Sequence, residues 1–369
     1  MSKIKSIEIY PVRLPLKQAM KLASEKIEST VNVFIRVLSS DNHHGWGEAS
    51  IAATMTGEYL VDVLFALDYS LIPHLIGEDT DNFTAIEYKI DRLIAGATTA
   101  KSALCMAIAD LVARQKDIPL WQLLGNKRRD SIPALKILSG SGQSQDDATL
   151  TDAIRAGYRY FKIKVGIDDP LEDAERICAI RATHGDKIAL SADANMAWDV
   201  DKALQFMRHA SPAGLQYLEQ PLKPADDDGL KMLLAHSSLM DIAADESLHT
   251  DADILRERHL GVMWFNLKLL KFGTYNHILA GVLNCDSTNG NVVLACKIAE
   301  SSVASSAMAH LAATVSRLNT GVSFTQDYLS QDVTSAPLSV RGGMVNISDT
   351  PGHGVEVNLD IIKSLQLKI

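Results

Sequence analysis

The sequence predicts an α/β protein, in which a barrel of parallel strands is joined to an α+β capping domain that is discontinuous in the chain. From about residue 131, short apolar runs alternate with amphipathic helical stretches in units of about 25–30 residues. Such units favour a parallel barrel over an open sheet, although the period alone does not exclude an open sheet. Both ends of the chain have the pattern of antiparallel strands and hairpins, so they are expected to meet in one cap.

The capping domain is placed at residues 1–125. Two of its expected strands are IKSIEIYPVRL and VNVFIRVLSS, and DNHHGWGE is a tight turn that leads into a third. From Gly57 to about Leu124 the period becomes helical, most clearly in AKSALCMAIADLVARQ. Pro119 and Gly125 close this region. Two lid segments of the cap, roughly residues 18–30 and 49–58, are expected to cover the ligand.

The barrel is placed at residues 126–335, and residues 336–369 are expected to return to the cap. Helical stretches such as PLEDAERICAIRATHG and VDKALQFMRHA separate several of the candidate strands. Those candidate strands are IPALKILSG, YFKIKVG, KIALSADAN, LQYLEQP, DIAADES, WFNLKLL and NVVLACKIAES.

Composition excludes several classes of function. Hydrophobic residues make up 47% and charged residues 22% of the 369 residues, which is ordinary for a globular enzyme. A net charge of −9 without a basic cluster argues against binding to nucleic acid. No apolar run reaches the roughly 18–20 residues that span a bilayer, and no signal peptide is evident. The four cysteines are far apart, so we expect reduced thiols in a cytoplasmic protein.

Three carboxylates stand at the ends of apolar runs, at Asp193, Glu219 and Asp245. Charges at the ends of buried strands are costly unless they are paired or bind a metal. Mg²⁺ prefers about six oxygen ligands, so three carboxylates leave positions for water and for a substrate carboxylate. We therefore expect one Mg²⁺, which Mn²⁺ can replace, and a small-molecule carboxylate as the substrate.

Lysines end the strands on either side of these acids. Lys162 and Lys164 are two residues apart, so their side chains share a face of the strand. Lys162 and the metal should lower the pKa of Lys164 towards that of a useful base. Lys268 would lie across the pocket, and two lysines on opposite sides of one α-carbon allow proton removal from one face and return on the other. A single Asp at a strand end is often a helix cap, and a Lys-x-Lys pair often lies at a solvated protein surface. Such structural roles do not readily explain the whole set of charges at successive strand ends.

A set of short motifs extends over nearly the whole chain: GWGEAS followed by TMTGE, PLWQLLG, FKIKVG, ADAN, LEQP, ADES, NLKLLKFG, AES with AHLAA, and PGHGVEV. In these motifs the chain resembles the enolase superfamily, in its muconate-lactonising branch. The mandelate-racemase branch uses a His/Asp pair late in the barrel, and no such pair is found in this sequence.

The resemblance implies a (β/α)7β barrel, a modified TIM barrel, with the α+β cap over it. It also implies Lys164 and Lys268 as the acid/base pair, with Lys162 supporting Lys164. The implied Mg²⁺ ligands are Asp193, Glu219 and Asp245.

Dipeptide epimerases of this branch resemble the chain in TMTGE and NLKLLKFG, and they hold the substrate ammonium with an Asp-x-Asp near the eighth strand. The matching stretch here is Thr325-Gln326-Asp327, so half of that anchor is missing. Glu25 falls where epimerases of acidic dipeptides place an arginine, which argues against an acidic dipeptide. An extra cation and an extra anion are instead expected in the pocket. The expected substrate-binding residues are Lys297, Asp327, Thr325, Glu25 and Lys136.

Three further residues are expected to support the site. Asn195 is a candidate hydrogen-bond donor to the metal carboxylates, and Glu246 is expected beside them. Glu300 either supports Lys268 or is an acid at a helix start.

The function predicted from these residues is Mg²⁺-dependent removal of the proton α to a carboxylate, which gives a metal-stabilised enolate. Racemisation or epimerisation of an amino-acid derivative or dipeptide is the favoured outcome. A muconate-type cycloisomerase and a β-elimination dehydratase stay open, as do a Schiff-base aldolase that uses Lys268 and a binding protein without activity. Self-association into a homo-oligomer is also expected.

Overall fold

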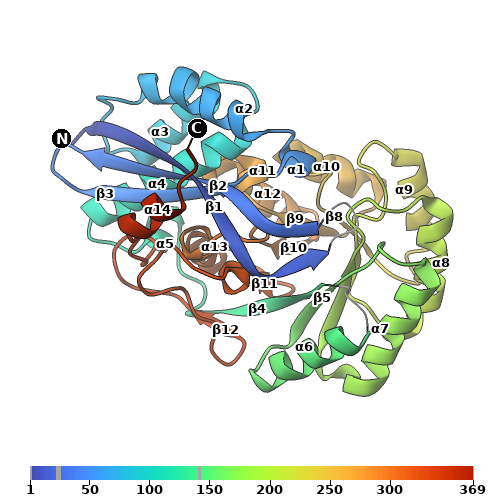
Figure 1. The fold of residues 1–369 in the computed structure, drawn as a ribbon. Coiled ribbons are helices and arrows are strands. Elements are labelled where there is room, and N and C mark those ends of the chain that lie inside the picture. The colour runs from blue at the N-terminus through green and yellow to red at the C-terminus, as the bar shows by residue number, and fades with distance from the viewer. Residues whose placement is uncertain (1, 22–25, 140–142, 369) are drawn as a thin grey trace.

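The chain folds into a three-stranded antiparallel cap sheet with helices, joined to a barrel of parallel strands (Figure 1). A computed structural model describes residues 2–21, 26–139 and 143–368. The barrel strands follow the order β10-β9-β8-β7-β6-β5-β4-β11. A bridge between Ala295 and Ser323 links the two ends of this order and nearly closes the barrel. The predicted fold class, a parallel barrel with a cap, is confirmed.

The cap begins with β1 (Ile4–Lys21), β2 (Lys26–Ser39) and β3 (His44–Ser50). β1 and β2 pair as far as Lys21 and Lys26, so the described part of the first expected lid segment is a hairpin arm. The helical elements that follow are α1 (Ala53–Thr56), α2 (Leu60–Phe65), a π-helical turn (Ala66–Leu71), a 3-10 turn (Ile72–His74), α3 (Phe83–Leu93), α4 (Thr98–Gln115) and α5 (Leu120–Leu124).

Strand β3 lies directly on helix α4, and its glycines permit this contact. A Cβ on Gly47 would stand 2.0 Å from the carbonyl oxygen of Ala103 and 2.6 Å from the nitrogen of Ala107. Both are backbone atoms of a buried helix, so they have no room to move aside. The GWG motif is therefore explained by the packing of the cap.

Gly47→Ala is expected to lower the free energy of unfolding by about 3 kcal/mol, because the new methyl group overpacks two backbones. Urea denaturation followed by circular dichroism measures this loss. Gly214→Ala is the control: there the methyl group meets no atom within 4 Å and the φ of +59° costs only about 1 kcal/mol of backbone strain. Equal losses in the two variants would contradict the packing explanation.

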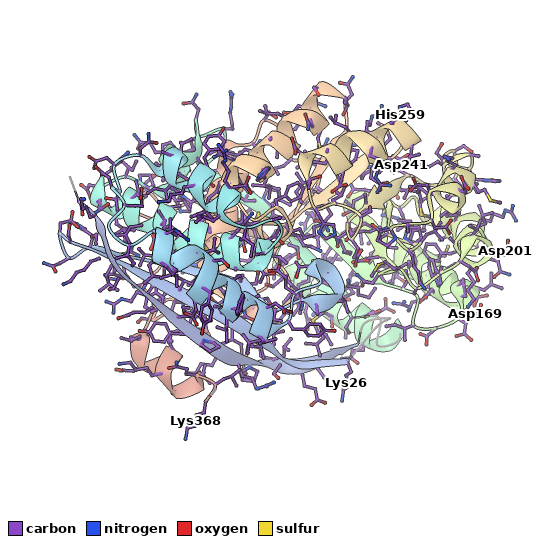
Figure 2. All side chains as sticks on the ribbon, turned by 90° about the horizontal axis from the view of Figure 1, so that it is seen from above. Lys26, Asp169, Asp201, Asp241, His259 and Lys368 are labelled. Carbon is purple, nitrogen blue, oxygen red and sulfur yellow. The ribbon has the colours of Figure 1, made fainter. Side chains whose placement is uncertain are left out.

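The barrel strands and helices alternate as the sequence predicts. Its strands are β4 (Ser131–Leu138), β5 (Tyr160–Lys164), β6 (Ala189–Asp193), β7 (Leu218–Glu219), β8 (Ile242–Ala244), β9 (Trp264–Leu267), β10 (Asn291–Leu294) and β11 (Val322–Ser323). Its helices are α6 (Gln143–Arg155), α7 (Pro170–His184), α8 (Val200–Ala210), α9 (Asp227–Leu234), α10 (Asp251–Leu260), α11 (Leu269–Phe272), α12 (Tyr275–Ser287) and α13 (Ser302–Thr314). Apolar side chains fill the interior, while charged residues such as Lys26 and Asp201 lie at the surface (Figure 2).

The C-terminal segment differs in part from the expectation that its hairpin joins the cap strands. β12 (Met344–Asn346) pairs antiparallel with the start of β4 in the barrel. The barrel neighbours of β4 do not pair with its first residues, so the backbone groups of these residues are available to β12. The later residues do reach the cap, because α14 (Leu359–Leu365) packs on β1 and the nitrogen of Leu367 donates to the carbonyl of Pro11 at 2.8 Å.

None of the described helices is long and apolar enough to cross a membrane. The domain boundaries and the homo-oligomer stay predictions.

Candidate active site

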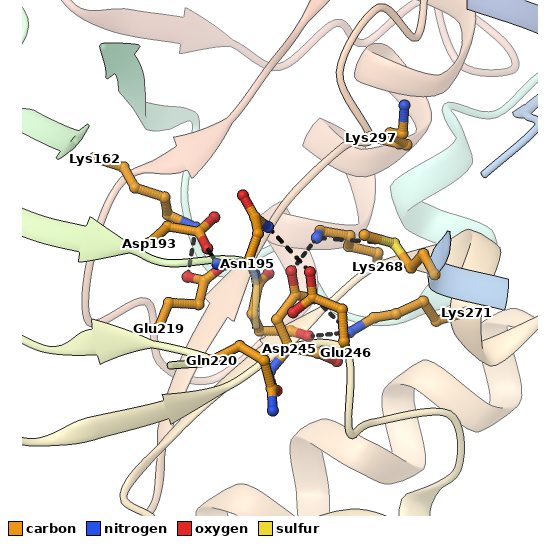
Figure 3. A network of polar contacts seen from close by, with 12 residues as sticks. Lys162, Asp193, Asn195, Glu219, Gln220, Asp245, Glu246, Lys268, Lys271 and Lys297 are labelled. Carbon is orange, nitrogen blue, oxygen red and sulfur yellow. Dashed lines mark hydrogen bonds and ion pairs between the residues drawn. The ribbon is translucent and has the colours of Figure 1, made fainter. Parts of the chain in front are cut away.

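The three predicted metal ligands lie side by side at the carboxyl ends of neighbouring barrel strands. Asp193 and Glu219 are register partners on β6 and β7, and Asp245 follows the last residue of β8. Each of the three residues is at most 2% exposed. Parallel strands bring their carboxyl ends to one edge of the sheet, which is why acids that are 26 residues apart in the sequence meet here (Figure 3).

Each acid is paired with a lysine. Lys164 Nζ lies 2.6 Å from Asp193 Oδ2, and Lys162 Nζ lies 2.5 Å from Glu219 Oε2. Lys268, directly after β9, donates to Asp245 Oδ2. The sequence-predicted lysines and acids therefore form one buried ion-paired cluster.

Burial and ion pairing shift the pKa values of this cluster in opposite directions. Burial raises the pKa of Glu219 to about 7, although Lys162 opposes the shift. Burial acts on Asp245 too, but Lys268 and Lys271 outweigh it and hold its pKa below the usual range. For Lys268, the loss of solvation is outweighed by Asp245 and Glu219, so its pKa is raised. Ion pairing thus favours the charged forms of Asp245 and Lys268, whereas burial outweighs it for Glu219.

The cluster has the donors that a hard cation needs. Among the described residues, no three His, Cys, Asp or Glu side chains are already arranged to coordinate a metal, since the acid oxygens face lysines. Two buried acceptors, Glu246 Oε2 and Asn266 Oδ1, have no hydrogen-bond partner among the described residues. Carboxylates with unsatisfied oxygen acceptors beside them suit Mg²⁺, so the residues present fit the expected ion.

A cavity of about 60 Å³ opens above the cluster, and Lys162, Lys164 and Lys268 line it together with Asp193, Glu219 and Glu246. The cap closes it through Thr54 and Met55, and Met55 Sδ lies 3.9 Å from Lys268 Nζ. Its remaining wall is mostly apolar, with one cation, and includes Ile137, Met196, Cys296, Lys297 and Ile298. Lys297 stands apart from the acid–lysine cluster in Figure 3.

Asn195 and Glu246 join the cluster as expected. Asn195 Oδ1 accepts from Lys164 Nζ at 2.7 Å, and its Nδ2 donates to Glu246 Oε1 at 3.0 Å. Burial, followed by the neighbouring Asp245, raises the pKa of Glu246 to about 7. Asn195 therefore gives the Lys164 ammonium a second oxygen acceptor beside its carboxylate partner.

Glu300 is not among the described residues that line the cavity. Its carboxylate accepts from the backbone nitrogen of Lys297 at 2.9 Å and, at 3.5 Å, from that of Ser50 in the cap. Thr325, expected to bind substrate, is fully buried and donates its hydroxyl to the carbonyls of Lys297 and Glu300. Both residues thus act on the segment that carries Lys297.

The structure does not bring Lys136 and Asp327 to the cavity. Alternation along β4 places Ile137 on the cavity wall and Lys136 on the other face, where its Nζ lies 4.6 Å from the ring centre of Tyr328. Asp327 lies in the 3-10 turn Gln326–Tyr328, and its carbonyl accepts from Lys17 Nζ at 2.9 Å. Glu25 lies outside the described residues.

Sequence reasoning missed Lys271 and Gln220. Lys271 is fully buried and donates to the carbonyl and carboxylate of Asp245 and, at 2.9 Å, to the carbonyl of Asn266. Gln220 Oε1 accepts from the nitrogen of Asp245 at 2.9 Å. A signal for Lys271 existed, because NLKLLKFG places it three residues after Lys268, about one helical turn away.

Lys271→Met is expected to lower the free energy of unfolding by about 3 kcal/mol, because it leaves two buried carbonyls and one side of Asp245 without a donor. Chemical denaturation measures the loss. Lys202→Met, at an exposed position in the first turn of α8, is the matched control and should change stability little. A Lys271→Met variant as stable as the control would contradict the anchoring role of this ammonium.

Comparisons with known proteins agree with this geometry. The family described as "Mandelate racemase / muconate lactonizing enzyme, N-terminal domain" matches residues 4–125, and "Enolase C-terminal domain-like" matches residues 146–361. The L-Ala-D/L-Glu epimerase of Clostridium acetobutylicum is 30% identical over 361 residues, which are 96% of this chain and 98% of that protein. The N-succinyl-L-Arg/Lys racemase of Bacillus cereus is 27% identical over 374 residues, 98% of each chain.

Among solved structures, the muconate lactonizing enzyme from Pseudomonas fluorescens, complexed with muconolactone, superposes with a TM-score of 0.95 at 27% identity. The match covers 99% of this chain and all of that one. Relatives named as epimerases, racemases and cycloisomerases are thus similar to the chain at nearly equal identity. Proteins of this family typically depend on a divalent metal. The chain belongs to the enolase superfamily, in its mandelate racemase/muconate lactonizing enzyme branch.

Proposed function

We propose that this enzyme removes the proton α to the carboxylate of a small substrate and returns a proton to the same carbon, so that an amino-acid derivative or dipeptide is racemised or epimerised. The observation that carries the proposal is the placement of Lys164 and Lys268. They come from strands four places apart in the barrel, line one cavity, and pair with different acids of the cluster.

We assign Asp193, Glu219 and Asp245 as the ligands of one Mg²⁺. The ion supplies positive charge beside the substrate carboxylate, which makes the neighbouring C–H proton more acidic. The protein's own groups then move the proton. A lysine on one side accepts it as a free amine, and the lysine on the other side donates one as an ammonium.

The neighbours of the two lysines support this division of roles. Asn195 Oδ1 holds Lys164 in place when its carboxylate partner is engaged elsewhere. Burial lowers the pKa of Lys162, but the neighbouring Glu219 carboxylate outweighs it and raises the pKa, so Lys162 supplies positive charge beside Lys164. Met55 covers Lys268 and keeps water from it.

The cavity wall favours an amino-acid derivative with a blocked nitrogen over a dipeptide with a free ammonium. Among the described residues, the acids that line the cavity all belong to the charged cluster, and Asp327 is not one of them. A substrate ammonium would therefore meet an apolar wall and the cation of Lys297. An acyl group that is apolar or ends in an anion suits this wall better.

A muconate-type cycloisomerase is the second candidate. It is favoured by the close superposition on the muconate lactonizing enzyme and by the small, largely apolar cavity. Such a reaction requires only one of the two lysines as a base or acid, whereas the proposed racemisation requires both. A β-elimination dehydratase also requires one base and differs by the loss of water.

Incubation in D₂O with Mg²⁺ tests the proposal. The probes are N-acylamino acids, dipeptides, hydroxy acids, lactones and muconate-type diacids, followed by mass spectrometry and chiral chromatography. We expect a gain of one dalton and inversion at the α-carbon for an N-acylamino acid, and neither change with chelator. A new lactone or a loss of eighteen daltons would move the assignment to a cycloisomerase or a dehydratase, and no deuterium in any probe would contradict the proposed proton transfer.

A further inference from the structure

A strained turn carries part of the cavity wall. Residues Lys297–Glu300 connect β10 to α13, and the nitrogen of Glu300 donates to the carbonyl of Lys297 at 3.1 Å. Ala299 in this turn has a φ of +65°, which is a strained backbone conformation for a residue with a Cβ. Lys297 and Ile298 of the same turn line the cavity. Strain of this kind persists only where the surroundings hold it.

Two hydrogen bonds within the barrel domain fix this turn. Thr325 donates its hydroxyl to the carbonyl of Lys297 at 2.8 Å, and the Glu300 carboxylate accepts from the nitrogen of Lys297. Neither contact reaches the carbonyl of the strained residue, Ala299. The carbonyl of Ala299 is instead bonded by the capping domain.

The cap holds the strained residue itself. Asn32 on β2 donates through Nδ2 to the carbonyl of Ala299 at 3.0 Å and to Glu48 Oε1 at 2.6 Å. Asn32 is fully buried and Glu48 is 1% exposed. Their contacts with the turn are therefore shielded from water, which would otherwise compete for the Ala299 carbonyl.

Glu48 also caps the barrel helix that follows the turn. Its Oε2 accepts from the Ser301 hydroxyl at 2.6 Å and from the nitrogens of Ser301 and Ala304 at 3.0 and 3.2 Å. These donors lie at the start of α13, where Ser301 is the N-cap residue and its own hydroxyl accepts from the nitrogen of Val303. The Glu48 carboxylate belongs to the capping domain, so the capping domain binds both the end of the turn and the start of the helix.

We propose that Asn32 and Glu48 are positioning residues for the active site, which fix the Lys297–Glu300 turn so that Lys297 and Ile298 face the substrate. Neither residue lines the cavity among the described residues. The cap thus shapes the pocket in two ways: Thr54 and Met55 cover it directly, whereas Asn32 and Glu48 act through the barrel turn. This inference rests on the proposed function for its kinetic readout.

The effect should fall on substrate binding rather than on proton transfer. The catalytic lysines and the metal carboxylates stand on β5, β6 and β7 or directly after β8 and β9, and none of their contacts described above involves the turn. Loosening the turn displaces the wall that contacts the distal part of the substrate. KM should therefore rise while kcat and Mg²⁺ affinity stay nearly constant.

Asn32→Leu tests the inference, because it keeps the size of the side chain and removes the shorter of the two hydrogen bonds from β2 to the Ala299 carbonyl, leaving the one from Thr30 Oγ1 at 3.4 Å. We expect KM for the best substrate to rise at least fivefold with kcat within twofold, and Mg²⁺ binding by calorimetry to be unchanged. Amide hydrogen exchange in a peptide spanning residues 295–304 should become faster. If this variant does not fold, Asn32→Ser removes the same reach with a smaller, polar side chain.

The Asn32→Leu substitution is also made in an Ala299→Gly variant, because glycine adopts the φ of this turn without strain. In that background, Asn32→Leu should change KM by less than twofold. Equal KM changes in both backgrounds, an unchanged KM, or a fall in kcat with weaker Mg²⁺ binding would each overturn the inference. If the wild type exchanges no α-proton with any probe, the proposed function fails, and the amide exchange of residues 295–304 still decides the role of Asn32.

Discussion

Lys164→Ala and Lys268→Ala are each expected to lower the rate of racemisation by about 10³-fold or more, which is within the range for loss of a general acid or base. Each variant should still exchange the α-proton of one enantiomer, because the remaining lysine faces only one side of the α-carbon. The two variants should therefore exchange opposite enantiomers. This reciprocity follows from two lysines that line one cavity from different strands.

Separate incubation of each pure enantiomer in D₂O, followed by NMR of the α-proton, measures this pattern. Lys187→Ala is the control, since Lys187 is exposed in a 3-10 turn at the far end of β6. A Lys164→Ala enzyme that exchanges both enantiomers would rule out a mechanism with one base on each side. Loss of exchange in only one of the two variants would favour a reaction with a single base, such as cycloisomerisation.

Removal of divalent metal is expected to lower α-proton exchange by more than about 10³-fold, and added Mg²⁺ or Mn²⁺ should restore it. The buried cluster holds four carboxylates and four lysines, so its formal charges already balance. A substrate carboxylate would add an unpaired negative charge to a buried site, which is costly without further positive charge. The residues counted are Asp193, Glu219, Asp245 and Glu246 with Lys162, Lys164, Lys268 and Lys271.

Exhaustive dialysis against chelator, with metal content measured by mass spectrometry, checks this expectation. Asp245→Asn should behave like the chelated enzyme and bind Mg²⁺ at least tenfold more weakly by calorimetry. Asp201→Asn, at a surface position (Figure 2), is the matched control for loss of one acid. Full exchange by enzyme that contains far less than one metal ion per chain would contradict the assigned role of the three carboxylates.

Much of the fold and of the charged cluster was predictable because strand ends are visible in the sequence. Asp193, Glu219 and Asp245 each close an apolar run, and barrel geometry brings such ends together. The confirmed parts are the fold class and the family. The chemical roles assigned to these residues stay predictions, since they depend on experiments with substrate and metal.

The substrate-binding residues were less predictable, for two physical reasons. The side chains of a strand change face at every residue, so placing Lys136 at the pocket needed a register that the sequence does not show. Thr325 was expected to contact substrate, but its hydroxyl donates to carbonyls of a turn that begins 28 positions earlier in the chain. Contacts between distant segments, such as Asn32 with Ala299, leave no local pattern at all.

The Glu48 carboxylate at the start of α13 has a consequence for how the chain is made. Glu48 precedes Ser301 by 253 residues, and at about 5–20 residues per second the ribosome needs roughly 13–50 seconds to supply that partner. Helix α14, which packs on β1, is made later still. The capping domain is thus synthesised first, but its contacts with later parts of the chain are among the last to form. During this interval its polar groups and strand edges are accessible to chaperones and proteases, before the barrel covers them.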